Sequence, residues 1–137
     1  MSRKTARKHI FNIIFQLEFN EITDIDINEV LETYSEEYEN TDGRDKEFII
    51  SECSGIFENI SKIDEIINAV SKGWSVDRLS KVDLAILRIA VYEINFDDDI
   101  PNKVAANEAV ELAKEFSTDK SPVFINGIIG KLISEGV

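Results

Sequence analysis

The stretch 80-SKVDLAILRIAVYEIN-95 decides the fold of this chain. Between Val82 and Ile94, apolar side chains occupy so many positions that a helix of these residues has almost no polar face. A helix that is apolar nearly all round lies in the middle of a bundle. β-Branched residues could instead indicate a buried strand, but a run of about 15 residues is longer than most strands. We therefore predict a central buried helix over residues 80–95.

Six further helices are predicted on either side of this segment. Apolar residues recur at helical spacing in 3–19, 26–38, 45–59, 61–72 and 103–116, and a seventh helix follows Ser121. Asp26 and Glu29 have the spacing of a capping box, and Ser61 is expected to cap the fourth helix. Gly73 is expected to end that helix, and Pro122 suits a first helical turn. The sequence predicts an all-α fold: one domain over 1–137, with seven helices in two subdomains around the central helix.

The charge is distributed unevenly along the chain. The net charge is −12, which taken alone argues against nucleic-acid binding. Residues 18–66 hold 16 acidic and three basic residues, whereas residues 1–17 hold Arg3, Lys4, Arg7 and Lys8 and no acid. The spacing of these four predicts one basic strip on the first helix, away from its apolar face. Such a strip could neutralise phosphates and stack on unpaired bases, or be a solvated face paired with the acidic body.

The residue pattern does not indicate an enzyme. His9 and Cys53 are the only histidine and cysteine, so neither a disulfide nor a zinc ligand set is expected. The run 97–99 lacks the ligand spacing of a calcium loop and is interpreted as a solvated loop. Cys53 lies on an apolar stripe and is expected in the core. We predict a non-enzymatic cytoplasmic protein with no cofactor, no metal, no signal peptide and no membrane span.

Three residues interrupt the helical pattern. Arg88 lies within the apolar run and needs a carboxylate partner if it is buried; Glu108 and Glu111 are the candidates. Gly127 and Gly130 lie in the last helix, where glycine costs about 1 kcal/mol relative to alanine. Close packing against another helix is the expected reason for both, with approach of a ligand to the backbone as the alternative.

Five segments in order resemble the NusB family of transcription antitermination proteins: 5-TAR-7, 73-GWSVDRL-79, 82-VDLAILRIAVYE-93, 107-NEAVELAK-114 and 124-FING-127. The resemblance is most specific from Gly73 to Ile129. Trp74, in the second segment, is interpreted as a core anchor rather than a base-stacking residue. The family fold implied is a bundle of seven helices in two halves.

The resemblance also implies a function. NusB-like proteins bind the boxA element of ribosomal RNA leader transcripts together with a small-subunit ribosomal protein, NusE, in a complex on RNA polymerase that suppresses termination. The RNA-binding residues implied here are Arg3, Lys4, Arg7, Lys8, Lys120, Phe124 and Asn126. The partner protein is expected to face the exposed side of the first helix and of the early central helix, which points to Phe15 and Asp83. Two positions depart from the family pattern: Val123 stands where a basic residue is usual, and Gly130 where a polar one is common. The alternative function is a helical protein–protein adaptor without direct RNA contact.

Overall fold

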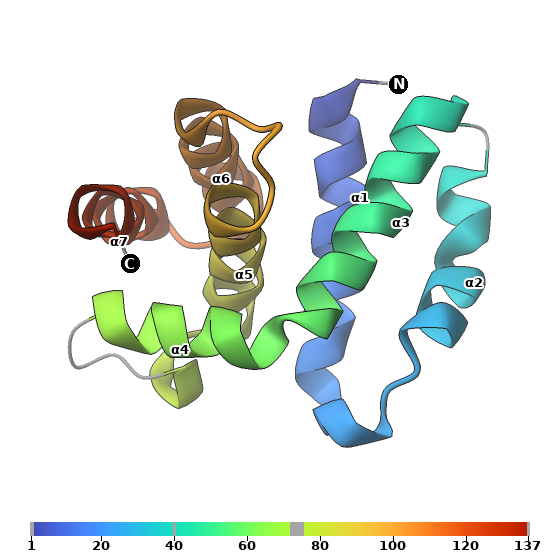
Figure 1. Ribbon diagram of the computed structural model, residues 1–137, viewed down its shortest axis with the longest axis horizontal. Helices are drawn as coiled ribbons and strands as arrows, with labels where there is room; N and C mark the ends of the chain where they lie inside the picture. The colour runs from blue at the N-terminus through green and yellow to red at the C-terminus, as the bar shows by residue number, and fades with distance from the viewer. Residues whose placement is uncertain (1, 40, 72–75, 137) are drawn as a thin grey trace. The chain divides into compact units, whose positions relative to one another are not determined.

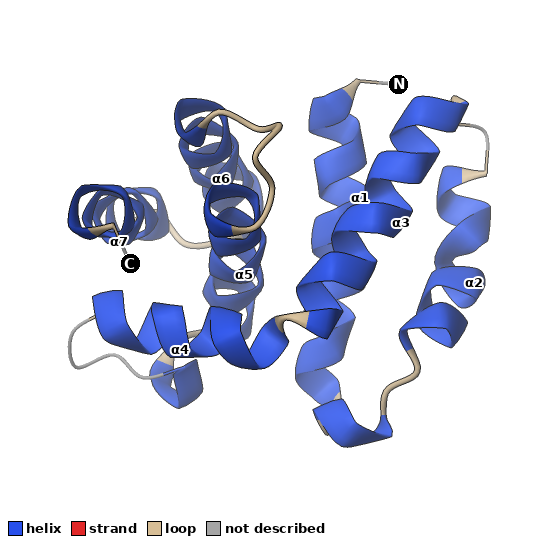
Figure 2. Ribbon diagram, in the orientation of Figure 1, coloured by secondary structure: helices blue, strands red, loops and turns tan. Residues whose placement is uncertain are grey.

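The computed structural model describes residues 2–39, 41–71 and 76–136, and all regular structure in these ranges is helical (Figures 1 and 2). Its α-helices are α1 Arg3–Gln16, α2 Ile27–Tyr38, α3 Gly43–Glu58, α4 Ile60–Val70, α5 Lys81–Asn95, α6 Asn102–Phe116 and α7 Ser121–Glu135. Three short 3₁₀ segments are η1 Leu17–Phe19, η2 Ile22–Asp24 and η3 Val76–Arg78. The predicted all-α class is confirmed. The chain divides into two compact units, residues 1–58 and 59–137.

The first unit consists of α1, α2 and α3, and α1 contacts both of the other helices. The apolar stripe of α1 is buried through Ile10 and Ile14, and Cys53 of α3 is fully buried, as its spacing predicted. Burial raises the pKa of the Cys53 thiol well above its usual value, which keeps it protonated and unreactive. The Tyr38 hydroxyl donates to the carbonyl of Leu31 at 3.0 Å, so this aromatic residue is buried with its polar atom satisfied.

Side-chain caps start the helices of this unit. Ser2 Oγ accepts a hydrogen bond from the backbone N–H of Thr5, and Asp26 Oδ1 accepts one from Asn28, as expected for the start of α2. Asp42 Oδ1 accepts from the N–H groups of Arg44 and Asp45. These hydrogen bonds, that from Asp45 most strongly, lower the pKa of Asp42 because they stabilise its charged form.

The second unit is organised by α5, which contacts α4, α6 and α7. Ten of the 15 residues of α5 are buried, so the prediction of a central buried helix is confirmed. Its N-cap is Ser80, whose Oγ accepts from the backbone N–H of Asp83 at 3.1 Å. Figure 1 shows α4, α6 and α7 around α5 in this unit.

Among the described residues, the carboxylate that pairs with Arg88 is Asp64 of α4, not Glu108 or Glu111 of α6. Arg88 Nε donates to Asp64 Oδ1 at 2.9 Å and Arg88 Nη2 donates to Asp64 Oδ2 at 2.8 Å. This two-pronged geometry is the strongest arrangement of an arginine–carboxylate pair. Sequence spacing could not identify the partner, because it does not show which neighbouring helix lies on the Arg88 side of α5.

Two further local predictions were wrong. Helix α4 begins at Ile60 after Asn59, so Ser61 is inside the helix and not its cap. Gly127 and Gly130 are exposed, and a Cβ atom added to either would meet nothing within 4 Å, so close helix packing does not explain them. Gly73 and Trp74 lie outside the described residues.

The burial of α5 predicts how a core substitution in this helix changes the free energy of unfolding. Leu87 is 0% exposed, and Leu87→Ala should lower the free energy of unfolding by about 2–5 kcal/mol, because it leaves a cavity. Chemical denaturation measures this. Val104→Ala, at an exposed apolar position on α6, is the matched control and should change the free energy by less than about 0.5 kcal/mol. A loss below about 1 kcal/mol for Leu87→Ala would contradict the central position of α5.

Candidate nucleic-acid interface

The first turn of α1 presents cations held by residues of α3. The guanidinium carbon of Arg3 lies 4.0 Å from the centre of the Phe48 ring, and Arg3 Nε lies 3.8 Å from Asp45 Oδ1. The Arg3 side chain is 50% exposed, and Lys4 is exposed beside it. A cation over an aromatic face is attracted by the ring quadrupole. Arg3 is therefore orientated by α3 while part of its guanidinium stays accessible.

Arg7 is not part of an exposed strip, contrary to the sequence prediction. It is 5% exposed, and its guanidinium carbon lies 5.3 Å from the centre of the same Phe48 ring. Successive helical residues are rotated by about 100°, so Arg3 and Arg7 share one side of α1, and Lys4 and Lys8 share another. Helix α3 covers the first side. The accessible cations of this turn are Arg3, Lys4 and the half-buried Lys8.

His9, next to these cations, is half-buried and lies against α2. Its Nδ1 is 3.3 Å from the Tyr34 hydroxyl, which also accepts a hydrogen bond from Asn12 Nδ2 at 3.1 Å. Burial lowers the pKa of His9, and the nearby Glu37 carboxylate opposes that shift. His9 is therefore neutral at pH 7 and adds no charge to the basic turn.

Phe15, the predicted partner-binding residue of this unit, belongs to a row of aromatic rings. The centres of Phe11 and Phe15 are 5.7 Å apart, and those of Phe15 and Phe19 are 5.2 Å apart. Phe15 is half-buried, whereas Phe19 is 60% exposed. Sequence reasoning missed Phe19, although its spacing of four residues from Phe15 was a usable signal.

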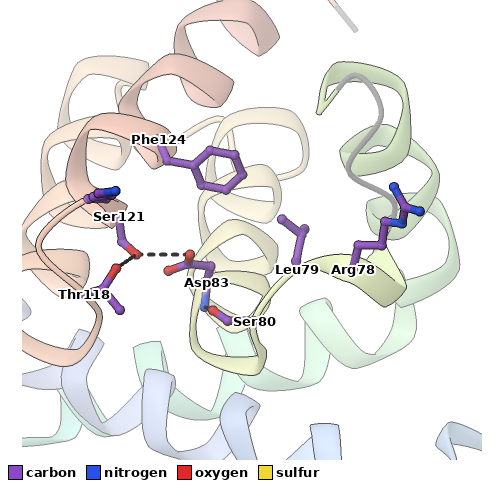
Figure 3. Close-up of a pocket in the computed structure, with 8 residues that line it drawn as sticks. Arg78, Leu79, Ser80, Asp83, Thr118, Ser121 and Phe124 are labelled. Atoms are coloured by element: carbon purple, nitrogen blue, oxygen red, sulfur yellow. Dashed lines mark hydrogen bonds between the residues drawn. The ribbon is translucent and has the colours of Figure 1, made fainter.

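In the second unit, the start of α7 lines a cavity of about 300 Å³ (Figure 3). Lys120 and Phe124, two predicted RNA-binding residues, lie there together with Arg78 and Leu79, which sequence reasoning did not select. Lys120 and Arg78 are exposed and Phe124 is half-buried. The third predicted residue, Asn126, is exposed but does not line this cavity, because it is rotated away from Phe124 by about 200° around the helix.

Asp83 is buried rather than presented on an exposed side of α5, contrary to the sequence expectation. It is 8% exposed, and its Oδ1 accepts from Ser117 Oγ at 2.7 Å while its Oδ2 accepts from Ser121 Oγ at 3.1 Å. These hydrogen bonds join the start of α5 to the connection between α6 and α7. The sequence could not show this, because the hydroxyl donors lie 34 and 38 residues away.

The described residues contain no group of three or more His, Cys, Asp or Glu side chains that could hold a metal ion. Asp98 and Asp99 are exposed, and Asp97 Oδ1 accepts from the N–H of Asp99, which agrees with a solvated loop. In the same part of the chain, no helix is long and apolar enough to cross a membrane.

Comparison with known proteins identifies the family. The model of the NusB family matches residues 4–134. This chain belongs to the NusB family. It is 42% identical to the transcription antitermination protein NusB of Agathobacter rectalis, over 96% of this chain and 98% of that protein. It is 46% identical to the protein of the same name from Acetivibrio thermocellus, over 97% of this chain and 89% of that protein.

Solved NusB structures have the same fold. NusB of T. maritima superimposes with a TM-score of 0.88 at 38% identity, covering 98% of this chain and 92% of that one. A structure of the antitermination factors NusB and NusE in complex with double-stranded RNA gives a TM-score of 0.85 at 24% identity, covering 97% and 96%. The resemblance seen in the five sequence segments is therefore confirmed, and so is the NusB-like arrangement of helices.

The different surroundings of Arg3 and Arg7 predict different stabilities for their variants. Arg7→Ala should lower the free energy of unfolding by about 1–3 kcal/mol, because it removes buried side-chain packing. Arg3→Ala should cost about 0–1 kcal/mol, because the Arg3 side chain is half-exposed and its ion pair with Asp45 is long, at 3.8 Å. Chemical denaturation of the two variants checks this, and equal losses would contradict the assignment of Arg7 to the interior.

Proposed function

We propose that this chain is a transcription antitermination factor that binds single-stranded boxA-like RNA of ribosomal RNA leader transcripts together with the small-subunit ribosomal protein NusE. Membership of the NusB family supports this, and a protein of the same fold occurs in a solved complex with NusE and RNA. The protein acts in the cytoplasm by binding, without a catalytic step, as part of the antitermination complex on RNA polymerase.

The observation that carries the RNA-binding part is the first turn of α1. Arg3 and Lys4 are exposed on a turn without an acidic residue, in a chain whose net charge is −12. The guanidinium of Arg3 is held over Phe48, so it loses less conformational freedom when it meets a phosphate. The negatively charged remainder of the chain repels non-specific polyanions, so RNA contact is limited to the few places that carry accessible cations.

The RNA-binding residues divide into two kinds. Arg3, Lys4, Lys8 and Lys120 supply accessible charge for phosphates, and Phe124 and Asn126 supply an aromatic face and an exposed amide for bases. The contribution of Arg7 is indirect, because it is buried against Phe48 and positions the surface that Arg3 shares.

NusE contact is assigned to the aromatic row of the first unit. Phe19 is exposed and is supported by Phe15, and exposed aromatic residues are enriched in protein interfaces. Asp83 supports NusE binding only indirectly, by holding the second unit together, because its carboxylate already accepts hydrogen bonds from two hydroxyl groups.

A salt titration of RNA binding tests the role of the basic turn. If Arg3 and Lys4 each neutralise one phosphate of a single strand, Arg3→Gln/Lys4→Gln should make the slope of log affinity against log salt shallower by about 1.4. Fluorescence anisotropy with a boxA-like RNA measures the slope. The control is Lys62→Gln/Lys103→Gln, which removes the same charge from exposed positions on α4 and α6. An unchanged slope in the first variant, or an equal change in the control, would contradict specific phosphate contact by this turn.

The partner protein provides a second test. NusE should raise the affinity of the wild-type chain for RNA. Phe19→Ala should reduce that gain and leave binding of RNA alone unchanged, because Phe19 lies in η1, at the opposite end of α1 from the basic turn. Titrations with and without NusE measure both quantities. Binding of NusE without any RNA affinity, alone or in the complex, would instead favour a protein–protein adaptor.

A further inference from the structure

Helix α2 has little apolar surface with which to hold its place in the first unit. Of its 12 residues only Leu31 and Tyr38 are buried, whereas α1 buries six of 14 and α3 five of 16. Its last turn carries Glu36 and Glu37 at the negative end of the helix dipole, where negative charge is unfavourable. The position of α2 therefore depends more than that of α1 or α3 on individual polar contacts.

One polar contact joins α2 to α1 through the single histidine of the chain. His9 Nδ1 lies 3.3 Å from the Tyr34 hydroxyl oxygen, and Asn12 Nδ2, one turn further along α1, donates to that oxygen at 3.1 Å. The His9 ring also meets the rings of Tyr34 and Tyr38 edge-on, with centres 5.9 and 6.4 Å apart. These two tyrosine rings stack on each other at 6.0 Å. His9 therefore contacts the same aromatic pair that holds α2 in the unit.

The hydrogen bonds of Tyr34 indicate which ring nitrogen of His9 carries the proton. The Tyr34 oxygen accepts from Asn12, so its own hydrogen is available to donate to His9 Nδ1. Nδ1 can accept only when it carries no proton, which places the proton of the neutral ring on Nε2. In the protonated ring both nitrogens are donors. The imidazolium form of His9 therefore cannot accept the Tyr34 hydroxyl hydrogen, and the contact between α1 and α2 is lost.

The groups that surround His9 on the neighbouring helices do not replace this contact. From α2, the carboxylate of Glu37 attracts a protonated ring, but Glu37 is exposed and the attraction is screened by water. From α3, the Cys53 thiol lies near the tyrosines of α2 and is kept uncharged by burial and by the neighbouring Glu52 carboxylate. On α1, Lys8 adds a positive charge beside His9, which opposes a second one. Burial has the largest effect on the pKa of His9 and lowers it.

We propose that His9 is a pH-sensitive clamp, which holds α2 against α1 while its imidazole is neutral and releases α2 when the imidazole is protonated. The inference does not depend on RNA binding. Because the pKa of His9 in the folded chain lies below its ordinary value of 6.5, the clamp contributes its full stability above pH 6.5, and this contribution is lost as the pH falls through the folded pKa. Release exposes Leu31 and Tyr38, the two buried residues of α2.

Nitrogen NMR of the chain labelled at its single histidine tests the state of the clamp. Above pH 6.5 the spectrum should show a neutral ring with its proton on Nε2, and a titration should give a pKa below 6.5. Tyr34→Phe keeps the ring and removes the hydroxyl that stabilises the neutral imidazole, so it should raise the pKa of His9. A neutral ring with its proton on Nδ1, or an unchanged pKa in Tyr34→Phe, would overturn the proposal.

Amide hydrogen exchange tests the release of α2. The protection factor is the intrinsic exchange rate at a given pH divided by the measured rate. In α2 it should fall by up to about tenfold for each pH unit between 6.5 and the folded pKa of His9, because opening takes up one proton. The protection factors of α1 and α3 should stay constant over the same range, in which the glutamates of α2 remain mostly ionised.

His9→Asn is the matched control, because its amide oxygen can accept near the position of Nδ1 and does not titrate. Its α2 protection should be independent of pH over this range. Tyr34→Phe should have lower α2 protection than the wild type above pH 6.5 and a weaker dependence on pH, because it lacks the clamp in both states of His9. An equal fall in the wild type and His9→Asn, or a fall shared by all three helices, would overturn the proposal.

Discussion

The second unit depends on the burial of α5 on nearly all sides. A helix with so little polar surface is stable in water only when other helices cover it, and α4, α6 and α7 do so. The charged residue in its middle adds a second requirement. Arg88 is buried and donates hydrogen bonds to both carboxylate oxygens of Asp64 on α4. Hydrophobic burial therefore brings the helices together, and this ion pair selects the face of α4 that meets α5.

The same burial positions the cavity at the start of α7. Asp83 lies in the first turn of α5, where Ser80 caps the helix. Because α5 is held firmly, the hydrogen bonds from Ser117 and Ser121 to Asp83 also place the start of α7, and with it Phe124 and Lys120. The geometry of this cavity thus depends on the buried carboxylate of Asp83, which links the start of α5 to the end of α6 and the start of α7.

The first unit uses a different interaction to prepare its surface. Arg3 and Arg7 lie over one ring, that of Phe48, yet one is half-exposed and the other is buried. The buried arginine contributes to packing, and the exposed one is left in a defined orientation towards solvent. Two residues of the same type and charge on the same side of α1 therefore differ in role, because Arg3 is the first residue of the helix and Arg7 lies one turn further along it, where it is buried.

The sequence by itself determined the helices, the central position of α5 and the family, because hydrophobic periodicity and capping residues are local signals that need no knowledge of neighbours. The charge pattern also indicated Arg3 and Lys4, since charge can be read without coordinates, whereas Lys120 and Phe124 were implied by the family resemblance. Only the tertiary structure decided that Arg7 and Asp83 are buried, that Asp64 pairs with Arg88, and that Arg78 joins Phe124 at one cavity. Each of these depends on which face of one helix meets a segment distant in the chain, and that choice is made by packing over the whole unit and not by the spacing of residues within a helix.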